Sequence, residues 1–104
     1  MSTRIDAVIR IDKCDSEGEP LSPMFFRNVR LMALKVSNNE PLWFGFVVME
    51  AADGSDVLSL GVNNRVSVAF INDIDATKAF WSGASYLIGD GIRTIGVIRL
   101  VNTA

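Results

Sequence analysis

The chain has 104 residues and a mass of 11.4 kDa, with 49% of its residues in the set AVILMFWYC and a formal net charge of −2. This length admits one domain, and the high apolar content with modest charge excludes intrinsic disorder. The longest apolar run, Leu42 to Met49, has eight residues, whereas a membrane-spanning helix needs ~18 or more.

The first third of the chain predicts a strand and then an acidic loop. Residues 4–13 alternate between apolar and charged side chains, a pattern typical of a strand with one face in water. Residues 14–23 contain three acidic residues and two prolines, which favour a loop. Residues 24–36 fit either a helix opened by Ser22-Pro23 or a strand.

The remainder predicts short strands separated by turns. Residues 42–51 are apolar on both faces and indicate a well-covered strand, followed by a hairpin turn at Asp53-Gly54. Further strands are expected at 57–62, 65–71 and 92–101. Turns are expected at Asn63-Asn64 and at Gly89-Asp90-Gly91, and a helical turn at 73–81.

About six short strands without a long helix indicate an all-β fold. A small antiparallel barrel or a sandwich would satisfy this pattern. We favour the barrel, because closure removes the exposed edges at which sheets aggregate.

The chain contains no histidine and only one cysteine, Cys14. Ser-His-Asp and Cys-His catalysis are therefore excluded within it, and a zinc site lacks its usual ligands. A reactive thiol needs nearby cations, whereas Asp12, Asp15 and Glu17 near Cys14 are acidic, so an ordinary cysteine is expected. We predict a non-enzymatic protein without a cofactor, a metal or a nucleotide.

The sequence also predicts where the protein is located and which class of partner it binds. One cysteine allows no internal disulfide, and the first residues lack the apolar segment of a secretory signal, so a cytoplasmic location is expected. The sequence pI of about 4.9 weighs against nucleic acid as a general partner, since phosphate binding needs clustered Lys and Arg.

Two blocks near the ends of the chain occur in a familiar order. They are Ile5–Ile11 with Glu17–Pro20, Ser22–Phe26 and Arg30, and then Gly83–Gly96. This order resembles the C-terminal barrel (domain 3) of elongation factor Tu and related translation GTPases. That family closes with an Arg-Glu-Gly-Gly-Arg-Thr-hydrophobic-Gly hairpin, and Gly91, Arg93, Thr94 and Gly96 stand at the matching spacing.

The resemblance implies a six-stranded antiparallel β-barrel that spans residues 1–104, with 24–36 as strand. Gly89 and Gly91 would then adopt positive φ in the last hairpin, and Gly96 would clear room inside the barrel. No phosphate-binding G-x-x-x-x-G-K-[ST] loop is present, so no GTPase activity follows.

The resemblance also implies an RNA site. The family's contacts with tRNA carry over to Arg30, Gly91 and Arg93. Met32 stands where the family has a glutamine that meets tRNA, and Ile92 replaces its second hairpin glycine. RNA binding is therefore the alternative function rather than the first.

Acidic residues in two segments offer oxygen ligands for a hard cation: Asp53, Asp56, Asp73 and Asp75. They do not match the calcium-loop pattern D-x-[DN]-x-[DN]-G-x5-E. Turn and helix-cap roles explain both segments and are the favoured interpretation.

Three pairs of adjacent aromatic residues predict a contact surface: Phe25-Phe26, Trp43-Phe44 and Phe80-Trp81. Neighbours on a strand point to opposite sides, and a small barrel holds few large side chains, so some rings must cover its outside. Loops that fold over them are the alternative. The expected protein interface comprises Trp43, Phe44, Phe80, Trp81, Arg27 and Arg30.

The basic residues Arg27, Arg30, Lys35, Arg93 and Arg99 are interpreted first as a solvated face, and a phosphate or RNA track and salt bridges to a partner protein are the alternatives. The sequence thus predicts a small β-barrel that binds a protein or a second copy of itself, without membrane contact. The process that it serves is not indicated.

Overall fold

The computed structural model describes residues 4–26, 30–71, 80, 83–90 and 92–101. These residues form eight strands and no α-helix, which confirms the expected all-β fold. The strands are β1 (Arg4–Ile11), β2 (Met24–Phe25), β3 (Leu31–Ser37), β4 (Glu40–Ala51), β5 (Val57–Leu58), β6 (Asn63–Phe70), β7 (Ser85–Gly89) and β8 (Thr94–Leu100).

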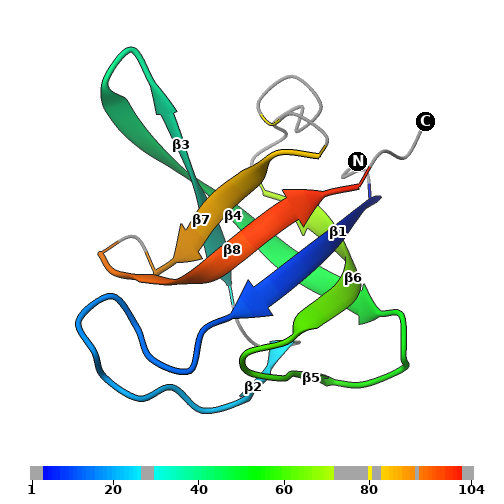
Figure 1. The fold of residues 1–104 in the computed structure, drawn as a ribbon. Helices are drawn as coiled ribbons and strands as arrows, with labels where there is room; N and C mark the ends of the chain where they lie inside the picture. Colours follow the sequence, from blue (N-terminus) through cyan, green and yellow to red (C-terminus); the bar gives the residue numbers. More distant parts are fainter. Residues whose placement is uncertain (1–3, 27–29, 72–79, 81–82, 91, 102–104) are drawn as a thin grey trace.

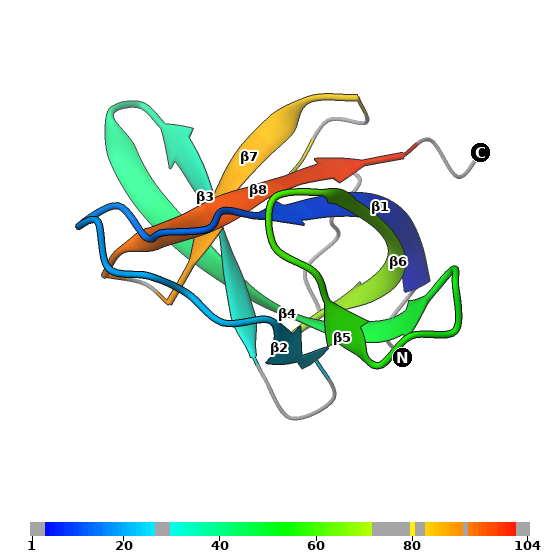
Figure 2. The same ribbon diagram turned by 60° about the horizontal axis from the view of Figure 1, so that its bottom comes forward.

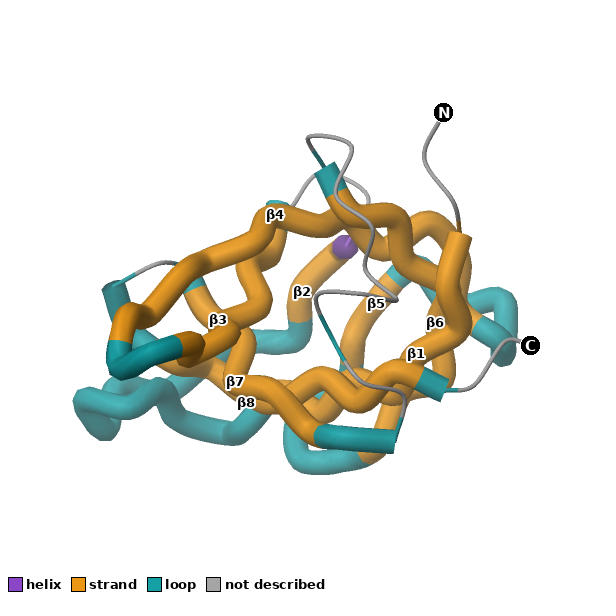
Figure 3. Tube along the Cα trace, turned by 90° about the horizontal axis from the view of Figure 1, so that it is seen from above, coloured by secondary structure: helices purple, strands orange, loops and turns teal. Residues whose placement is uncertain are grey.

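Six of these strands close into an antiparallel barrel in the order β1-β6-β4-β3-β7-β8, with β8 returning to β1 (Figure 1). Seen from above, they form a closed ring (Figure 3). Strands β2 and β5 form a separate two-stranded sheet at one end of the barrel (Figure 2). The expected six-stranded antiparallel barrel is therefore confirmed.

The core is made by the inward-facing side chains of the barrel strands. Strand β1 shows the rule, because Ile5, Ala7, Ile9 and Ile11 are at most 6% exposed while the charged residues between them face solvent. This is the period of two that the sequence predicted. The largest fully buried side chains include three phenylalanines, Phe26, Phe46 and Phe80.

Two glycines permit close approach of neighbouring backbones. A Cβ on Gly96 would collide with the carbonyl oxygen of Arg10 on β1, and one on Gly89 would collide with that of Arg93. Gly89 lies at an irregularity in the β7–β8 pairing and does not have positive φ. Its expected role is therefore corrected: it admits a backbone rather than a left-handed turn. Gly91 lies outside the described residues.

Within the ambiguous segment 24–36, residues 24–25 and 31–36 are strand. Strand β2 pairs with β5, and β3 pairs with β4 along its whole length. The interpretation as a helix is therefore wrong for these residues, because cross-strand pairing uses the backbone groups that a helix would bond internally. Most of the helical turn expected at 73–81 lies outside the described residues.

Several turns differ from expectation. The Asp53-Gly54 turn does not close a hairpin, since β4 pairs with β6 and β5 with β2. Asn63 and Asn64 belong to β6, and the positive φ near them is at Gly61. Asn64 instead clamps this turn with its side chain, whose Nδ2 donates to the carbonyl oxygens of Ile9 and Ser59, each at 3.1 Å.

The β3–β4 hairpin extends beyond the barrel rim (Figure 1). Its turn residues Asn38 and Asn39 have φ of 53° and 64°, the left-handed conformation that a two-residue hairpin turn requires. Pairing of β3 with β7 involves Met32 and Ala33 alone among the described residues. Within the described part of the chain, the outer part of β3 is therefore paired with β4 alone, and not also with β7.

Candidate functional site

The aromatic pairs divide between the inside and the outside of the sheet. Phe44 packs against the core, whereas Trp43 faces outward from β4 and is half-buried. Phe26 is 2% exposed and Phe25 is 66% exposed. The inference that adjacent rings point to opposite sides is thus confirmed for these two pairs.

Phe80 lies inside the barrel and is 1% exposed. Its ring centroid is 5.1 Å from that of Phe70 and 4.7 Å from that of Tyr86, and Phe44 contacts it edge-on at 5.5 Å. Phe80 therefore belongs to the core, and its expected role as a surface anchor is corrected, because a ring enclosed by other rings has no face left for a partner. Phe44 packs against this core but is only half-buried, and its role in an interface stays a prediction.

The outward side chains of the β3–β4 hairpin form a continuous apolar surface, which we call the outer apolar face. The register places Met32 beside Gly45, Leu34 beside Trp43, and Val36 beside Pro41 on this side. Val47 continues the same face of β4. Its members are Met32, Leu34, Val36, Pro41, Trp43 and Val47, and Val36 is 62% exposed.

Arg30 lies at the border of the outer apolar face. A Cβ built on Gly45 would lie 3.7 Å from Cδ of Arg30 and 3.4 Å from Cδ1 of Ile71, so these two side chains flank the glycine. Two of the predicted interface residues, Trp43 and Arg30, thus share one surface. Arg27 and Trp81 lie outside the described residues. The sequence missed the aliphatic members, whose common face depends on the β3–β4 register.

Arg93, the predicted RNA contact, is held by two carboxylates. Its guanidinium donates from Nη1 to Oδ2 of Asp15 and from Nε to Oδ2 of Asp90, the latter at 3.2 Å. Asp15 lies in the β1–β2 loop and also accepts backbone N–H groups from Glu17 and Glu19 at 2.8 and 3.0 Å. The three side chains therefore join this loop to the β7–β8 turn, and the guanidinium is largely occupied.

The contacts among Asp15, Asp90 and Arg93 lower the pKa of both the Asp15 and the Asp90 carboxyl. Burial raises the pKa of Asp15, but hydrogen bonds from Glu19, Glu17 and Arg93 outweigh it, so the pKa falls below its ordinary value. The N–H groups of Arg93 and Ile92 lower the pKa of Asp90 from 3.8 to about 2, against a smaller opposing effect of burial. The hydrogen bond that Arg93 donates to Asp90, with the negative charge of Asp15, raises the pKa of Arg93.

These shifts predict loss of stability in acid. Because the folded pKa of Asp90 is below the unfolded one, the unfolded chain binds more protons in this range. The stabilisation is complete above about pH 4 and is lost as the pH falls toward 2. Urea midpoints measured from pH 5 to 2 should fall with pH, and the fall should be shallower in Asp90→Asn. Equal midpoints at pH 4 and pH 2.5 would contradict this expectation.

Of the acidic residues proposed for a cation, Asp53 has a turn role. Oδ1 of Asp53 accepts the N–H of Ser55 at 2.8 Å, as the turn interpretation expects. Asp56 is exposed, and Asp73 and Asp75 lie outside the described residues. Within the described part of the chain, no group of three or more His, Cys, Asp or Glu side chains could hold a metal ion.

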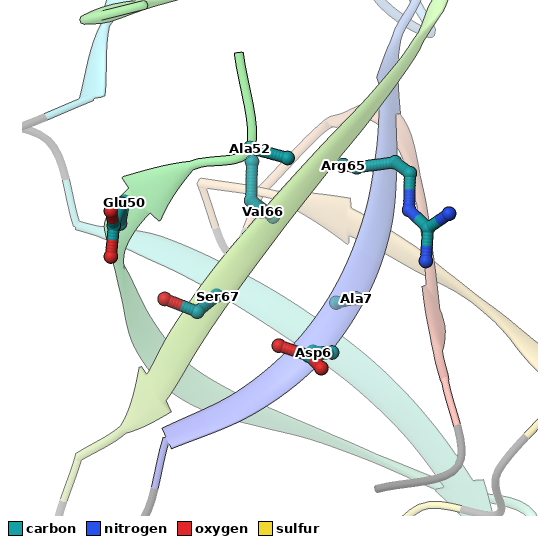
Figure 4. Close-up of a pocket in the computed structure, with 7 residues that line it drawn as sticks. All are labelled: Asp6, Ala7, Glu50, Ala52, Arg65, Val66 and Ser67. Atoms are coloured by element: carbon teal, nitrogen blue, oxygen red, sulfur yellow. The ribbon is translucent and has the colours of Figure 1, made fainter. Parts of the chain in front are cut away.

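A shallow groove of about 330 Å³ on the outer wall contains two further carboxylates (Figure 4). Asp6 and Glu50 lie on opposite sides of β6, and the Ser67 side chain lies between them. Glu50 also pairs with Arg4 at 3.7 Å. A paired-carboxylate hydrolase requires two carboxylates that converge on one scissile bond, and these two do not converge.

Comparison with protein-family models, curated proteins and solved structures finds no match to this chain. The resemblance to domain 3 of elongation factor Tu thus stays a prediction. No helix within the described residues is long and apolar enough to span a membrane.

Proposed function

We propose that this chain is a non-catalytic, cytoplasmic binding module that acts through protein contact, and that its outer apolar face binds the same face of a second copy. The observation that supports this proposal is the continuous row of outward pairs Met32–Gly45, Leu34–Trp43 and Val36–Pro41. Isolated apolar side chains are ordinary on a protein surface, whereas a contiguous patch is typical of an interface.

The charge pattern favours a second copy as the partner. None of these six side chains is charged, so two such faces can pack about a two-fold axis without opposing like charges. Arg30 stands at the border, where its charge keeps contact with water. Trp43 lies within the face and belongs to the residue class that dominates binding energy in interfaces.

The size of the face indicates weak association. From strand rise and spacing it measures roughly 20 by 15 Å, or about 300 Å² per copy, so a contact between two copies lies well below the ~1,200 Å² of stable specific complexes. We therefore expect a concentration-dependent equilibrium between monomer and dimer.

Replacing Val36 by glutamate should abolish this association. The side chain is 62% exposed, so the change costs little folding stability but places a charge beside its own copy across the two-fold axis. Sedimentation equilibrium up to millimolar protein should show dimers for the wild type and monomers for Val36→Glu. Trp43→Ala should weaken the dimer by tenfold or more, since it removes the largest ring of the face.

Val62→Glu is the matched control. Val62 is 51% exposed in the β5–β6 turn and lies outside the outer apolar face, so this variant should dimerise like the wild type. A wild type that stays monomeric at millimolar concentration contradicts self-association. Equal loss in Val36→Glu and Val62→Glu assigns the effect to net charge and contradicts the proposed surface.

RNA binding is the second proposal that the resemblance suggested, through Arg30, Gly91 and Arg93. The contacts of Arg93 with Asp15 and Asp90 do not favour it, because these carboxylates compete with phosphate for the same donors. Protein contact is therefore the function that the geometry supports better.

A further inference from the structure

Two arginines flank one residue on the outer wall of the barrel, on the β6–β1–β8 side. The register pairs Val8 of β1 with Arg65 of β6 and with Arg99 of β8. Directly paired residues project from the same face of a sheet. The Cα atoms of the two arginines are separated by two strand spacings, roughly 10 Å, a gap that two arginine side chains can span above Val8.

A groove of about 470 Å³ lies between these arginines. Its lining includes both arginine side chains, the apolar residues Val8, Leu100 and Val101, and Asn63 and Gly83. The surface therefore combines two cations with an apolar floor. Figure 4 shows the Arg65 side chain extending across β1, on the side away from Glu50.

The two arginines have no acidic partner among the described residues, while three other arginines of the barrel do. Arg4 pairs with Glu50 at 3.7 Å, Arg10 with Asp12 at 3.9 Å, and Arg93 with two aspartates. Arg65 and Arg99 are both exposed and form no ion pair with any described carboxylate. Their positive charges are thus available to a ligand.

We propose that this groove binds a phosphate monoester that carries an apolar group. A dianionic phosphate matches two positive charges, and the guanidinium fork donates paired hydrogen bonds to its oxygens. The apolar part of the ligand lies on Val8 and Val101. An extended polyanion fits less well, because Asp6 lies on the same face of β1 and would repel the next phosphate on that side. Arg10, on the other side of Val8, is already paired with Asp12 at 3.9 Å.

Phenyl phosphate is the first probe, since it combines the two parts of the ligand in one small molecule. Titration into the whole chain, followed by amide shifts in NMR, should show saturable changes around Val8, Arg65 and Arg99. Phenol should bind at least tenfold more weakly. Arg65→Gln and Arg99→Gln should each raise the dissociation constant about tenfold, because each removes a charge-assisted hydrogen-bonding group.

Arg4→Gln is the matched control, as it removes the same charge from an exposed position outside this groove. It should bind phenyl phosphate like the wild type. A peptide with phosphotyrosine distinguishes the source of the phosphate. Tighter binding than phenyl phosphate indicates a phosphorylated side chain, and equal or weaker binding indicates a free small molecule.

Three results would overturn the proposal. They are the absence of saturable shifts, equal affinity in the double variant Arg65→Gln/Arg99→Gln, and tighter binding of a single-stranded RNA 12-mer through the same two arginines. The last result would replace the monoester with a phosphodiester backbone, and its affinity would fall steeply with salt.

Discussion

Replacing Gly96 by alanine is expected to destabilise the barrel strongly, because the added methyl group would collide with the backbone of the neighbouring strand. A Cβ at this position would meet the carbonyl oxygen and carbon of Arg10 and the Cα of Ile11, with the two carbon atoms both at 3.0 Å. These atoms all belong to the backbone of β1, so no side-chain rotation can relieve the collision. Strands β1 and β8 would have to separate where they close the barrel.

The expected loss is at or above the upper end of the about 1–3 kcal/mol that overpacking costs. This is a large part of the ~5–15 kcal/mol by which small domains are stable. Urea unfolding followed by circular dichroism measures it. Gly45→Ala is the matched control, because the added methyl there would touch only side-chain atoms at 3.4 Å or more. Similar unfolding midpoints for the two variants would contradict the role assigned to Gly96.

The sequence predicted the barrel because alternation is a local property. In β1, the order of isoleucines and charged residues alone indicates which side is buried. The segment 24–36 could not be assigned in this way, since its helical stripe and its strand alternation are both apolar. Pairing with β4 decides between them, and such pairing depends on residues that are distant along the chain.

The candidate surface was predicted only in part, for a related reason. Alternation indicates that Trp43 and Phe44 point to opposite sides, but it does not tell which of them is inside. It also could not show that Leu34 and Val36 lie beside Trp43 and Pro41, because the register fixes this. The pairing of Arg65 and Arg99 across Val8 depends equally on the order of strands around the barrel.

Phe80→Ala is expected to lower the free energy of unfolding by about 3–5 kcal/mol, the usual cost of deleting a buried phenylalanine ring. The side chain is 1% exposed, and three aromatic rings contact it. Its loss leaves a cavity, because Phe70 and Tyr86 are anchored on different strands and cannot both move into it. Urea unfolding provides the measurement, with Phe25→Ala as the control.

The pair of variants Phe80→Ala and Phe25→Ala also distinguishes the core from the contact surface. Phe25 is 66% exposed, so its truncation should change the unfolding free energy by less than about 1 kcal/mol. Neither variant removes a side chain of the outer apolar face, and the folded fraction of each should dimerise with the affinity of the wild type. If Phe80→Ala instead kept full stability and lost association, Phe80 would be an interface anchor. The cluster of the Phe44, Phe70, Phe80 and Tyr86 rings would then not be the core that holds the barrel closed.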